Sequence, residues 1–238
     1  MIKDIFDHKK TLSFEVFPPK KDQDIYNIYQ TLDNLRDLSP DFISVTYGAG
    51  GSNSKKTAKI ATYIKNMCDI EAIAHLTAVA MTPDALEDII STLRSKQVTN
   101  ILALRGDRPK DMSDADYNNR TYTYASDLIK AINPKDEICI GAACYPEIHP
   151  ESIDLESDLT NLRHKVDTGV SFLITQLFFD NDCFLRFLDN ARAHGITVPI
   201  IPGIMPITTS SQIGTTVKLS GSSIPSELLL VELVLIVA

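Results

Sequence analysis

The 238-residue sequence predicts an α/β fold of the (β/α)8 barrel type. Apolar runs of strand length recur along the chain, and segments with helical periodicity or helix signals lie between them. Repeated strand-then-helix units predict parallel strands joined by right-handed crossovers. The length is also close to the ~250 residues typical of this barrel. No linker or break in composition divides the chain, so we expect one barrel domain over residues 1–238, with a doubly wound open sheet as the alternative.

Seven runs are expected to form strands, at residues 12–17, 41–47, 71–79, 100–106, 137–145, 171–179 and 198–205. Residues 22–37 repeat apolar side chains at helical spacing. Thr82 and Pro83 open a further helix as its N-cap and first residue, and Gly169 stands where another helix should end. Seven strands are one short of closure. The sequence therefore predicts a barrel whose eighth β/α unit is missing and which keeps unpaired edges.

Composition and charge exclude several classes of function. The formal net charge is −8 and the pI is near 5.1, which argues against nucleic acid as a partner, because phosphate binding needs a basic face. The amino-terminal residues lack the apolar stretch of a signal peptide, so a cytoplasmic location is expected. The late apolar run at residues 228–238 is too short to span a bilayer and contains Glu232, so no membrane role is predicted.

The cysteines show neither CxxC pairs nor zinc-like spacing; they are Cys68, Cys139, Cys144 and Cys183. Two of them, Cys139 and Cys144, lie in or beside an apolar run of strand length. We expect reduced core residues there, and no metal site.

Polar side chains recur near the carboxyl ends of six expected strands, where barrels of this type build their active sites. The six sets are Glu15; Thr46 and Tyr47; His75 and Thr77; Arg105 and Asp107; Tyr145, Glu147 and His149; and Gln176. A single buried polar residue is often a satisfied core residue. Packing alone does not explain six strands that are polar near the same end, so the pattern predicts a common ligand site.

Three of these features have alternative explanations. The glycine-rich turn at residues 48–53 carries Asn53 where a dinucleotide fingerprint needs its third glycine, so the Rossmann interpretation fails. What remains is either a simple strand–helix turn or a turn whose backbone approaches a ligand closely. His75 could equally be a satisfied core histidine. Lys165 could belong to a solvated helix face.

Several motifs, taken together, resemble those of the flavin-dependent methylenetetrahydrofolate reductases of the short bacterial kind. In order they are SFEVFPPK, DFISVTYGAGGS, AHLT, ILALRGDRP, YASDLI, CYPEIHPES, TQLFFD and PIIPGIMPI. They cover residues 11–207, whereas residues 208–238 end in an apolar tail that departs from the pattern and looks truncated or frameshifted. The resemblance implies a (β/α)8 barrel with FAD at the strand carboxyl ends. It implies that NADH or NADPH reduces the flavin, and that 5,10-methylenetetrahydrofolate is then reduced to 5-methyltetrahydrofolate by ping-pong turnover. A folate substrate and a nicotinamide dinucleotide would be the partners, and a homo-oligomer is compatible with the family.

The resemblance also assigns residues to roles. It implies that Glu15 is the catalytic acid, that Asp107 tunes the flavin and assists folate binding, and that Gln176 contacts folate. Thr46 corresponds to a nicotinamide contact. The implied flavin contacts are Tyr47, Ala49, His75, Arg105, Gly106, Asp107, Tyr124, Ala125, Tyr145, His149, Asp158, Asn161 and Lys165.

Elementary chemistry agrees with a catalytic acid. The five-membered ring of the folate must open before it accepts a hydride, and the leaving nitrogen then needs a proton. We expect Phe14, Val16 and Phe17 to desolvate Glu15 and so raise the pKa of its carboxyl group. One rival is a non-catalytic relic that binds flavin or folate. Another is a flavin-free barrel lyase or aldolase, which lacks a strand-end lysine because Lys20 and Lys21 lie beyond the end of the first strand.

Overall fold

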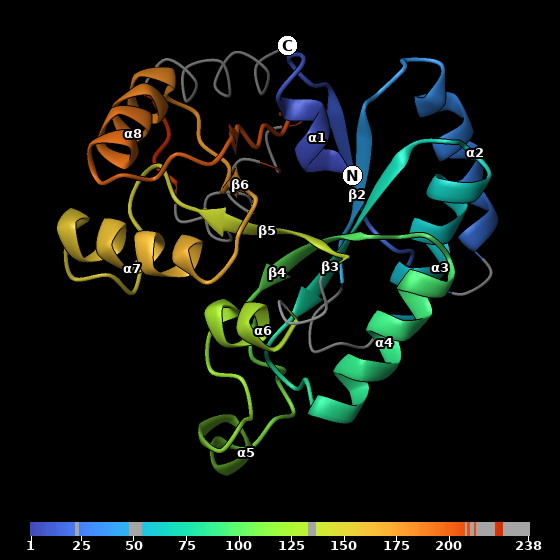
Figure 1. The fold of residues 1–238 in the computed structure, drawn as a ribbon, viewed down its shortest axis with the longest axis horizontal. Helices are drawn as coiled ribbons and strands as arrows, with labels where there is room; N and C mark the ends of the chain where they lie inside the picture. Colours follow the sequence, from blue (N-terminus) through green and yellow to red (C-terminus); the bar gives the residue numbers. More distant parts are fainter. Residues whose placement is uncertain are drawn as a thin grey trace. The chain divides into compact units, whose positions relative to one another are not determined.

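A computed structural model describes residues 1–21, 24–47, 54–132, 137–207, 209, 212 and 222–225 of the chain (Figure 1). Its contacts group the chain into two compact units. Unit 1 comprises Met1–Ala142 and Thr168–Ser171, and unit 2 comprises Ala143–Asp167 and Phe172–Ala238. One domain over residues 1–238 stays a prediction.

Strands and helices alternate through both units. The elements of unit 1 are α1 (Ile2–Phe6), β1 (Ser13–Val16), α2 (Ile25–Arg36), β2 (Phe42–Val45), α3 (Ser54–Asn66), β3 (Glu71–Thr77), α4 (Pro83–Ser95), β4 (Asn100–Leu104), α5 (Asp114–Asn118) and α6 (Ala125–Ile132). Strand β5 (Cys139–Cys144) crosses into unit 2, which adds α7 (Leu155–Asp167), β6 (Phe172–Thr175), α8 (Asn181–Ala193) and β7 (Ile200–Ile201).

The strand order settles the choice between the two predicted architectures. The seven strands follow one another as β1-β2-β3-β4-β5-β6-β7, and strands β1 to β5 pair in parallel, as do β6 and β7. A doubly wound sheet reverses its order at a switch point. No reversal occurs among the described strands, so that alternative is wrong and an incomplete (β/α)8 architecture is confirmed. The residues described contain no eighth strand.

The strands of unit 1 have one apolar face and one mixed face, which carries polar residues among apolar ones such as Phe42, Ile73 and Leu102 and is called the polar face below. Register pairs Phe14 with Ile43 on one face and Glu15 with Ser44 on the other. Because side chains alternate along a strand, the remaining positions follow. The apolar face continues with Val16, Val45, Ala72, Ala74, Leu76, Ile101 and Ala103, and the polar face with Thr46, His75 and Thr77. Helix α3 contacts β2 and β3, and α6 contacts β4 (Figure 1), so the apolar face forms the core beneath the helices.

Helix boundaries follow the capping residues that the sequence predicts. The Thr82 side chain accepts a hydrogen bond from the backbone N–H of Ala85 at 3.2 Å, and Pro83 is the first residue of α4. Gly169 follows the end of α7 with φ of 115°, a value that glycine adopts without steric strain. The expected caps are therefore confirmed.

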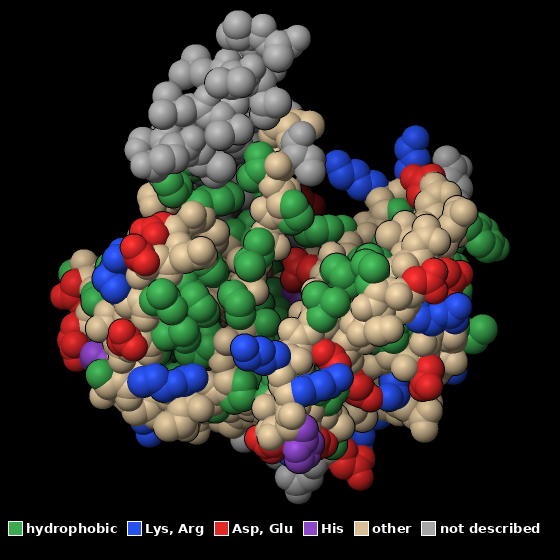
Figure 2. Space-filling model, turned by 90° about the horizontal axis from the view of Figure 1, so that it is seen from above, with side chains coloured by type: hydrophobic (Ala, Val, Ile, Leu, Met, Phe, Trp, Pro, Cys, Tyr) green, Lys and Arg blue, Asp and Glu red, His purple; other side chains and the backbone are tan. Residues whose placement is uncertain are grey.

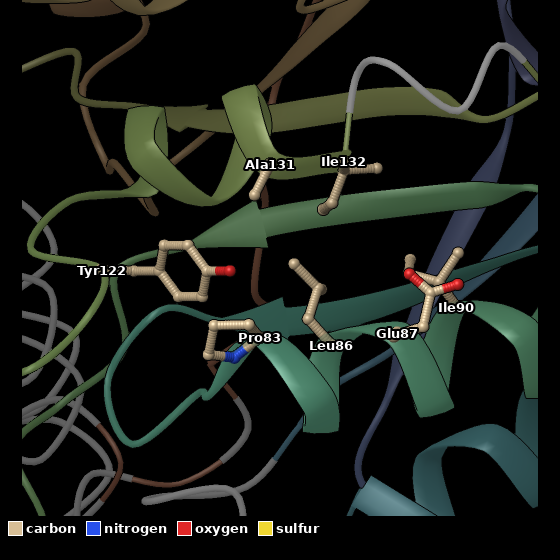
Figure 3. Close-up of a pocket in the computed structure, with 7 residues that line it drawn as sticks. All are labelled: Pro83, Leu86, Glu87, Ile90, Tyr122, Ala131 and Ile132. Atoms are coloured by element: carbon tan, nitrogen blue, oxygen red, sulfur yellow. The ribbon is translucent and has the colours of Figure 1, made fainter.

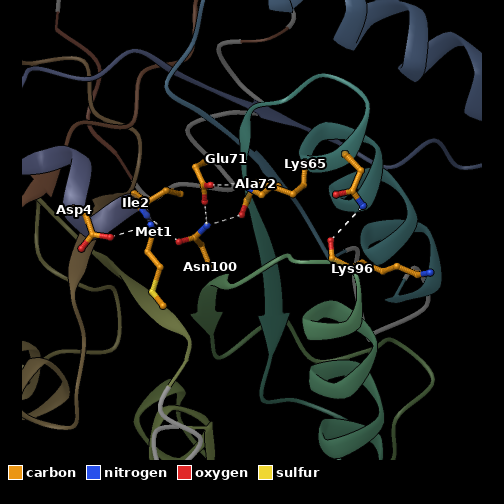
Figure 4. Close-up of polar contacts among 9 residues, drawn as sticks. Met1, Ile2, Asp4, Lys65, Glu71, Ala72, Lys96 and Asn100 are labelled. Carbon is orange, nitrogen blue, oxygen red and sulfur yellow. Dashed lines mark hydrogen bonds and ion pairs between the residues drawn. The ribbon is translucent and has the colours of Figure 1, made fainter.

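Helix α1 is attached to the amino-terminal end of β4 through Asn100 (Figure 4). Asn100, which is 1% exposed, accepts a hydrogen bond from the backbone N–H of Ile2 at 3.0 Å. Its amide donates to Glu71 Oε2 at 2.7 Å and to the carbonyl of Ala72 at 3.1 Å. Lys65 completes the network by an ion pair with Glu71. Every polar group of this buried cluster has a partner, which is the condition for stability in a protein interior.

The described surface, helices and cysteines have the following features. Lys and Arg side chains lie among Asp and Glu side chains on the face shown in Figure 2. Among the described helices, none is both long and apolar enough to cross a membrane. All four cysteines are free, and Cys139 and Cys144 are buried.

Asn100→Ala should lower the free energy of unfolding by about 2 kcal/mol, because it leaves the Ile2 N–H and the Glu71 carboxylate without their buried partner. Urea denaturation followed by circular dichroism measures this change. Asn66→Ala is the matched control, since the Asn66 amide is exposed and bonds only to the Lys96 carbonyl at 3.3 Å. The control should change stability by less than about 0.5 kcal/mol. Equal losses in both variants would contradict the role given to Asn100.

Candidate functional site

Glu15 lies on the polar face of β1, and its neighbours come from the two adjacent strands. The Ser44 hydroxyl on β2 donates a hydrogen bond to Glu15 Oε2 over 3.4 Å. Nε2 of His75 on β3 lies 3.5 Å from the same oxygen. Register explains this cluster, because Ser44 is the Cα partner of both Glu15 and Ile73, and His75 follows Ile73 by two positions on the same face. Three strands therefore converge on one carboxyl group.

Burial raises the pKa of the Glu15 carboxyl, and the hydrogen bond from Ser44 opposes this rise. The side chain is 44% exposed, so the carboxyl is recessed among protein atoms yet open to solvent. The predicted direction of the pKa shift and its cause, desolvation, are confirmed, but the residues expected to surround the carboxyl are wrong. Phe14 and Val16 occupy the opposite face and Phe17 is 67% exposed, whereas the groups in contact with the carboxyl belong to β2 and β3.

His75 is a neutral neighbour of this carboxyl group. Burial lowers its pKa to about 3, so the ring carries no charge at physiological pH and forms no ion pair with Glu15. Its Nε2 and the Thr77 hydroxyl are both buried, and neither has a hydrogen-bond partner among the residues described. Native proteins rarely leave such atoms unsatisfied. Near the carboxyl end of β3, the polar face therefore has two buried groups that could form hydrogen bonds with a ligand.

The predicted residues Arg105, Gly106 and Asp107 follow β4 directly, beside the end of β3. Gly106 has φ of +80°, and a Cβ atom there would lie 2.7 Å from the Cβ of Thr77. Only glycine fits this approach. The Val79 N–H donates to the Arg105 carbonyl at 2.9 Å and so holds the two strand ends together. Asp107 is exposed on the loop beyond them.

The other predicted residues of unit 1 lie at strand and helix ends. Thr46 follows β2, and its carbonyl accepts a hydrogen bond at 2.8 Å from the buried Thr57 hydroxyl of α3. Tyr47 is buried, whereas Tyr124 is 58% exposed at the start of α6, next to Ala125. Ala49 and the glycine-rich turn lie outside the described residues.

In unit 2, Asp158 of α7 organises the loop that follows β5. Its two carboxylate oxygens accept hydrogen bonds from the Ser152 hydroxyl at 2.8 Å and from the His149 N–H at 3.2 Å. The ring of Tyr145 packs edge-on against His149, with centroids 4.6 Å apart. His149 Nδ1 accepts from the Glu151 N–H at 3.1 Å, so the neutral ring carries its proton on Nε2 and presents a donor there.

Lys165 lies on the same face of α7 as Asp158 and Asn161, because the three positions are separated by three and four residues. Its ammonium group donates to the Ala143 carbonyl at 2.6 Å. Burial lowers the pKa of Lys165, whereas the Asp158 charge raises it. The interpretation of Lys165 as a solvated surface residue is wrong. A desolvated cation suits an anionic ligand.

Gln176 directly follows β6. Its backbone N–H donates to the Cys144 carbonyl at 2.7 Å, and its side-chain oxygen accepts from the Leu177 N–H at 2.9 Å. The side-chain oxygen is therefore anchored to the chain, and the amide NH2 is the end that can donate to a ligand.

Sequence reasoning missed Ser44 and Thr57. The run at residues 42–45 was treated as apolar although it contains one hydroxyl, and a buried hydroxyl needs a partner just as a buried carboxylate does. Glu15 was identified because a polar residue in an apolar strand needs a reason to be there, and the same criterion would have identified Ser44. Thr57 gave no such signal, because its partner is a backbone carbonyl.

A cavity in the helix layer of unit 1 contains none of the predicted site residues. The described residues contain no group of three or more His, Cys, Asp or Glu side chains that could hold a metal ion. A cavity of about 160 Å³ lies between α4 and α6 (Figure 3). It is lined by Pro83, Leu86, Glu87, Ile90, Tyr122, Ala131 and Ile132, none of which is a predicted site residue. This cavity lies in the helix layer, away from the polar face.

Parallel strands in sequential order, with a recessed carboxyl group and unsatisfied polar atoms near their carboxyl ends, define a (β/α)8-type protein with a ligand site at the strand ends. The chain belongs to the methylenetetrahydrofolate reductase family, whose profile matches residues 1–233. The match extends past residue 207, where the quoted motifs stop.

Named relatives agree with this membership. The chain is 38% identical over 215 residues to 5,10-methylenetetrahydrofolate reductase of Escherichia coli, which covers 90% of this chain and 71% of that protein. It is 36% identical over 233 residues to methylenetetrahydrofolate reductase (NADH) 1 of Zea mays, covering 93% of this chain and 39% of that protein. A probable methylenetetrahydrofolate reductase (NADH) of Oryza sativa is 39% identical over 212 residues. The chain spans 36% of the rice protein, so it matches only part of the plant relatives.

A solved structure shares the fold. It is a Clostridium thermocellum protein described as binding two copies of 5-methyl-5,6,7,8-tetrahydrofolic acid. Its TM-score is 0.65 at 17% identity, covering 95% of this chain and 76% of that one.

Glu15→Gln should make the chain more stable relative to the wild type as the pH rises. The folded carboxyl has a raised pKa, so the folded state binds its proton more tightly than the unfolded state does. Wild-type stability therefore falls as the pH rises above the ordinary glutamate pKa, and the uncharged amide escapes this loss.

Thermal unfolding between about pH 4.5 and pH 8 measures the difference in Tm between the variant and the wild type. Asp88→Asn, on the exposed face of α4, is the control and should follow the wild type across the range. A difference in Tm that shrinks with rising pH would contradict a desolvated Glu15.

Proposed function

We propose that this chain is an FAD-dependent reductase that converts 5,10-methylenetetrahydrofolate to 5-methyltetrahydrofolate, with NADH or NADPH as reductant in a ping-pong cycle. The observation that carries the proposal is the carboxyl group of Glu15, recessed on the polar face with a raised pKa and a neutral histidine beside it. Family membership supplies the substrate class. The names of the maize and rice relatives include NADH, and the Clostridium neighbour is described with a bound folate.

Each unit, taken by itself, carries groups that suit a part of FAD. In unit 1, His75 Nε2 and the Thr77 hydroxyl are buried atoms that lack partners among the described residues, and Gly106 allows a close backbone approach. In unit 2, the desolvated Lys165 and the Nε2 donor of His149 suit a diphosphate. We assign the remaining flavin contacts to Tyr47, Ala49, Arg105, Asp107, Tyr124, Ala125, Tyr145, Asp158 and Asn161, and the nicotinamide contact to Thr46. FAD, when bound, supplies the hydride chemistry, which side chains do not provide.

Glu15 is the acid of the folate step. The product keeps its one-carbon unit on N5, so the bond from that carbon to N10 must break and N10 must receive a proton. A carboxyl group with a raised pKa retains its proton closer to neutrality and can donate it. A charged imidazolium 3.5 Å away would lower the pKa of Glu15, but burial keeps His75 neutral. Asp107 and the Gln176 amide are the proposed folate contacts.

The purified full chain should be yellow, should bleach when NADH is added without oxygen, and should regain its colour on addition of 5,10-methylenetetrahydrofolate. Glu15→Gln should keep the colour and the bleaching, but its reoxidation by folate should slow by about 10²-fold or more. Stopped-flow absorbance measures both half-reactions separately, with Asp88→Asn as the control.

Full folate turnover in Glu15→Gln would overturn the assignment of the acid. A folded but colourless wild-type chain would overturn the flavin proposal. A yellow chain that never bleaches would instead be a flavin-binding protein without this activity.

Lys165→Met should weaken FAD binding by about 10- to 100-fold, because it keeps the buried alkyl chain but removes a charge-assisted hydrogen bond to phosphate. Fluorescence titration of the apoprotein with FAD measures the change in Kd. Lys130→Met, on the exposed face of α6, is the matched control and should bind FAD like the wild type. An unchanged Kd in Lys165→Met would remove Lys165 from the site.

A further inference from the structure

Ser44 is the buried polar residue in direct contact with the proposed acid. Strand β2 is buried at all four positions, and Ser44 is 3% exposed within it. Leaving a buried hydroxyl unpaired costs about 1–3 kcal/mol, so the position requires an acceptor. The acceptor recorded for it is Glu15 Oε2, at 3.4 Å.

The two contacts to Glu15 converge on one oxygen. Ser44 Oγ and His75 Nε2 lie 3.4 Å and 3.5 Å from Oε2, respectively. Nε2 of His75 is close to Oε2 but does not form a hydrogen bond with it, since Nε2 has no hydrogen-bond partner among the residues described. Ser44 is therefore the group that donates to the carboxyl, while His75 limits the space beside Oε2. We therefore take Oε1, the oxygen to which Ser44 does not donate, as the one that carries the transferable proton in the proposed reaction.

We propose that Ser44 is a positioning residue that holds Oε2 of Glu15 and thereby turns the protonated Oε1 toward the folate. The proposal rests on the proposed function, because it refines the acid step of that reaction. The strand register supports this role of Ser44 independently. Glu15 and Ser44 are Cα partners in adjacent strands, so their side chains lie side by side on one face of the sheet. Parallel pairing thus fixes the two groups relative to each other, and the hydroxyl cannot serve a distant partner.

The hydrogen bond also has a defined electrostatic effect. A hydroxyl donor stabilises the ionised carboxylate more than the neutral acid, so Ser44 opposes the desolvation that raises the pKa of Glu15. Without Ser44 the carboxyl would hold its proton more tightly and release it more slowly. With Ser44 the pKa of Glu15 stays raised by burial, and the carboxylate that forms on proton release accepts a hydrogen bond from the hydroxyl.

The direct test is a ¹³C NMR titration of the full chain labelled at the glutamate carboxyl carbons. Loss of one signal in Glu15→Gln assigns Glu15. In Ser44→Ala the pKa of Glu15 should rise by about one unit relative to the wild type, because the donor is lost. Ser44→Thr restores a hydroxyl and should return the titration toward the wild type. Ser44→Cys is close in size but a weak donor, and should behave like Ser44→Ala.

The kinetic test follows the pH dependence of the folate half-reaction in the same variants. Its apparent pKa should move upward with that of Glu15 in Ser44→Ala and Ser44→Cys, and it should recover in Ser44→Thr. Ser95→Ala is the matched control, since the Ser95 hydroxyl donates to the Thr92 carbonyl at 2.8 Å on the exposed end of α4. If Ser44→Ala does not fold, Ser44→Cys makes the same comparison.

The two proposals fail differently. An unchanged or lowered Glu15 pKa in both Ser44→Ala and Ser44→Cys overturns the role of Ser44, whatever the catalytic result. A wild-type chain that binds no flavin, or reduces no folate, overturns the proposed function, while the NMR titration still decides the contact between Ser44 and Glu15.

Discussion

A strand presents alternate residues to its two faces, and this period of two constrains everything else in unit 1. One face carries Ile43, Val45, Ala74 and their neighbours, and it must pack beneath the helices to be buried. The other face must then carry Glu15, Ser44 and His75. A slip of one residue in the register of β1 would turn Glu15 into the helix layer and Phe14 or Val16 out of it. Burial of the apolar face thus fixes the strand register, and the register keeps the Glu15 carboxyl next to Ser44 and His75.

The polar face serves two different purposes at its two ends. At the amino-terminal ends of the strands, Asn100 and Glu71 are fully partnered, by α1 and by Lys65. Near the carboxyl ends, His75 Nε2 and Thr77 Oγ1 are buried and lack partners among the described residues. A satisfied network stabilises a fold, whereas unmet hydrogen bonds within it are usually explained by a ligand. The same face thus has a satisfied end and an end suited to the proposed ligand, the division between stability and function that (β/α)8 barrels show in general.

The sequence predicts features that depend on local patterns, such as strands and helix ends. It does not predict contacts that depend on how the strands pair. Apolar runs located the strands, Thr82 and Gly169 located helix ends, and the isolated charge of Glu15 pointed to the site. The surroundings of Glu15 were assigned to its chain neighbours, which alternation places on the opposite face. Ser44 is 29 positions away and becomes adjacent only through strand pairing. Helix α1 escaped prediction for a related reason, because its anchor is a hydrogen bond between Ile2 and Asn100 across 98 positions.

The charges of the Glu15 cluster are mutually consistent. A protonated His75 would favour an ionised Glu15, and an ionised Glu15 would favour a protonated His75, so the pair could have formed an ion pair. Burial of the imidazole prevents this by lowering its pKa to about 3, and without that cation the carboxyl keeps a raised pKa. In the proposed reaction Glu15 gives up its proton, and the Ser44 hydroxyl is the one group of the cluster that donates to the new carboxylate. Since the side chain is 44% exposed, solvent can return the proton to the carboxylate, as an acid that acts repeatedly requires.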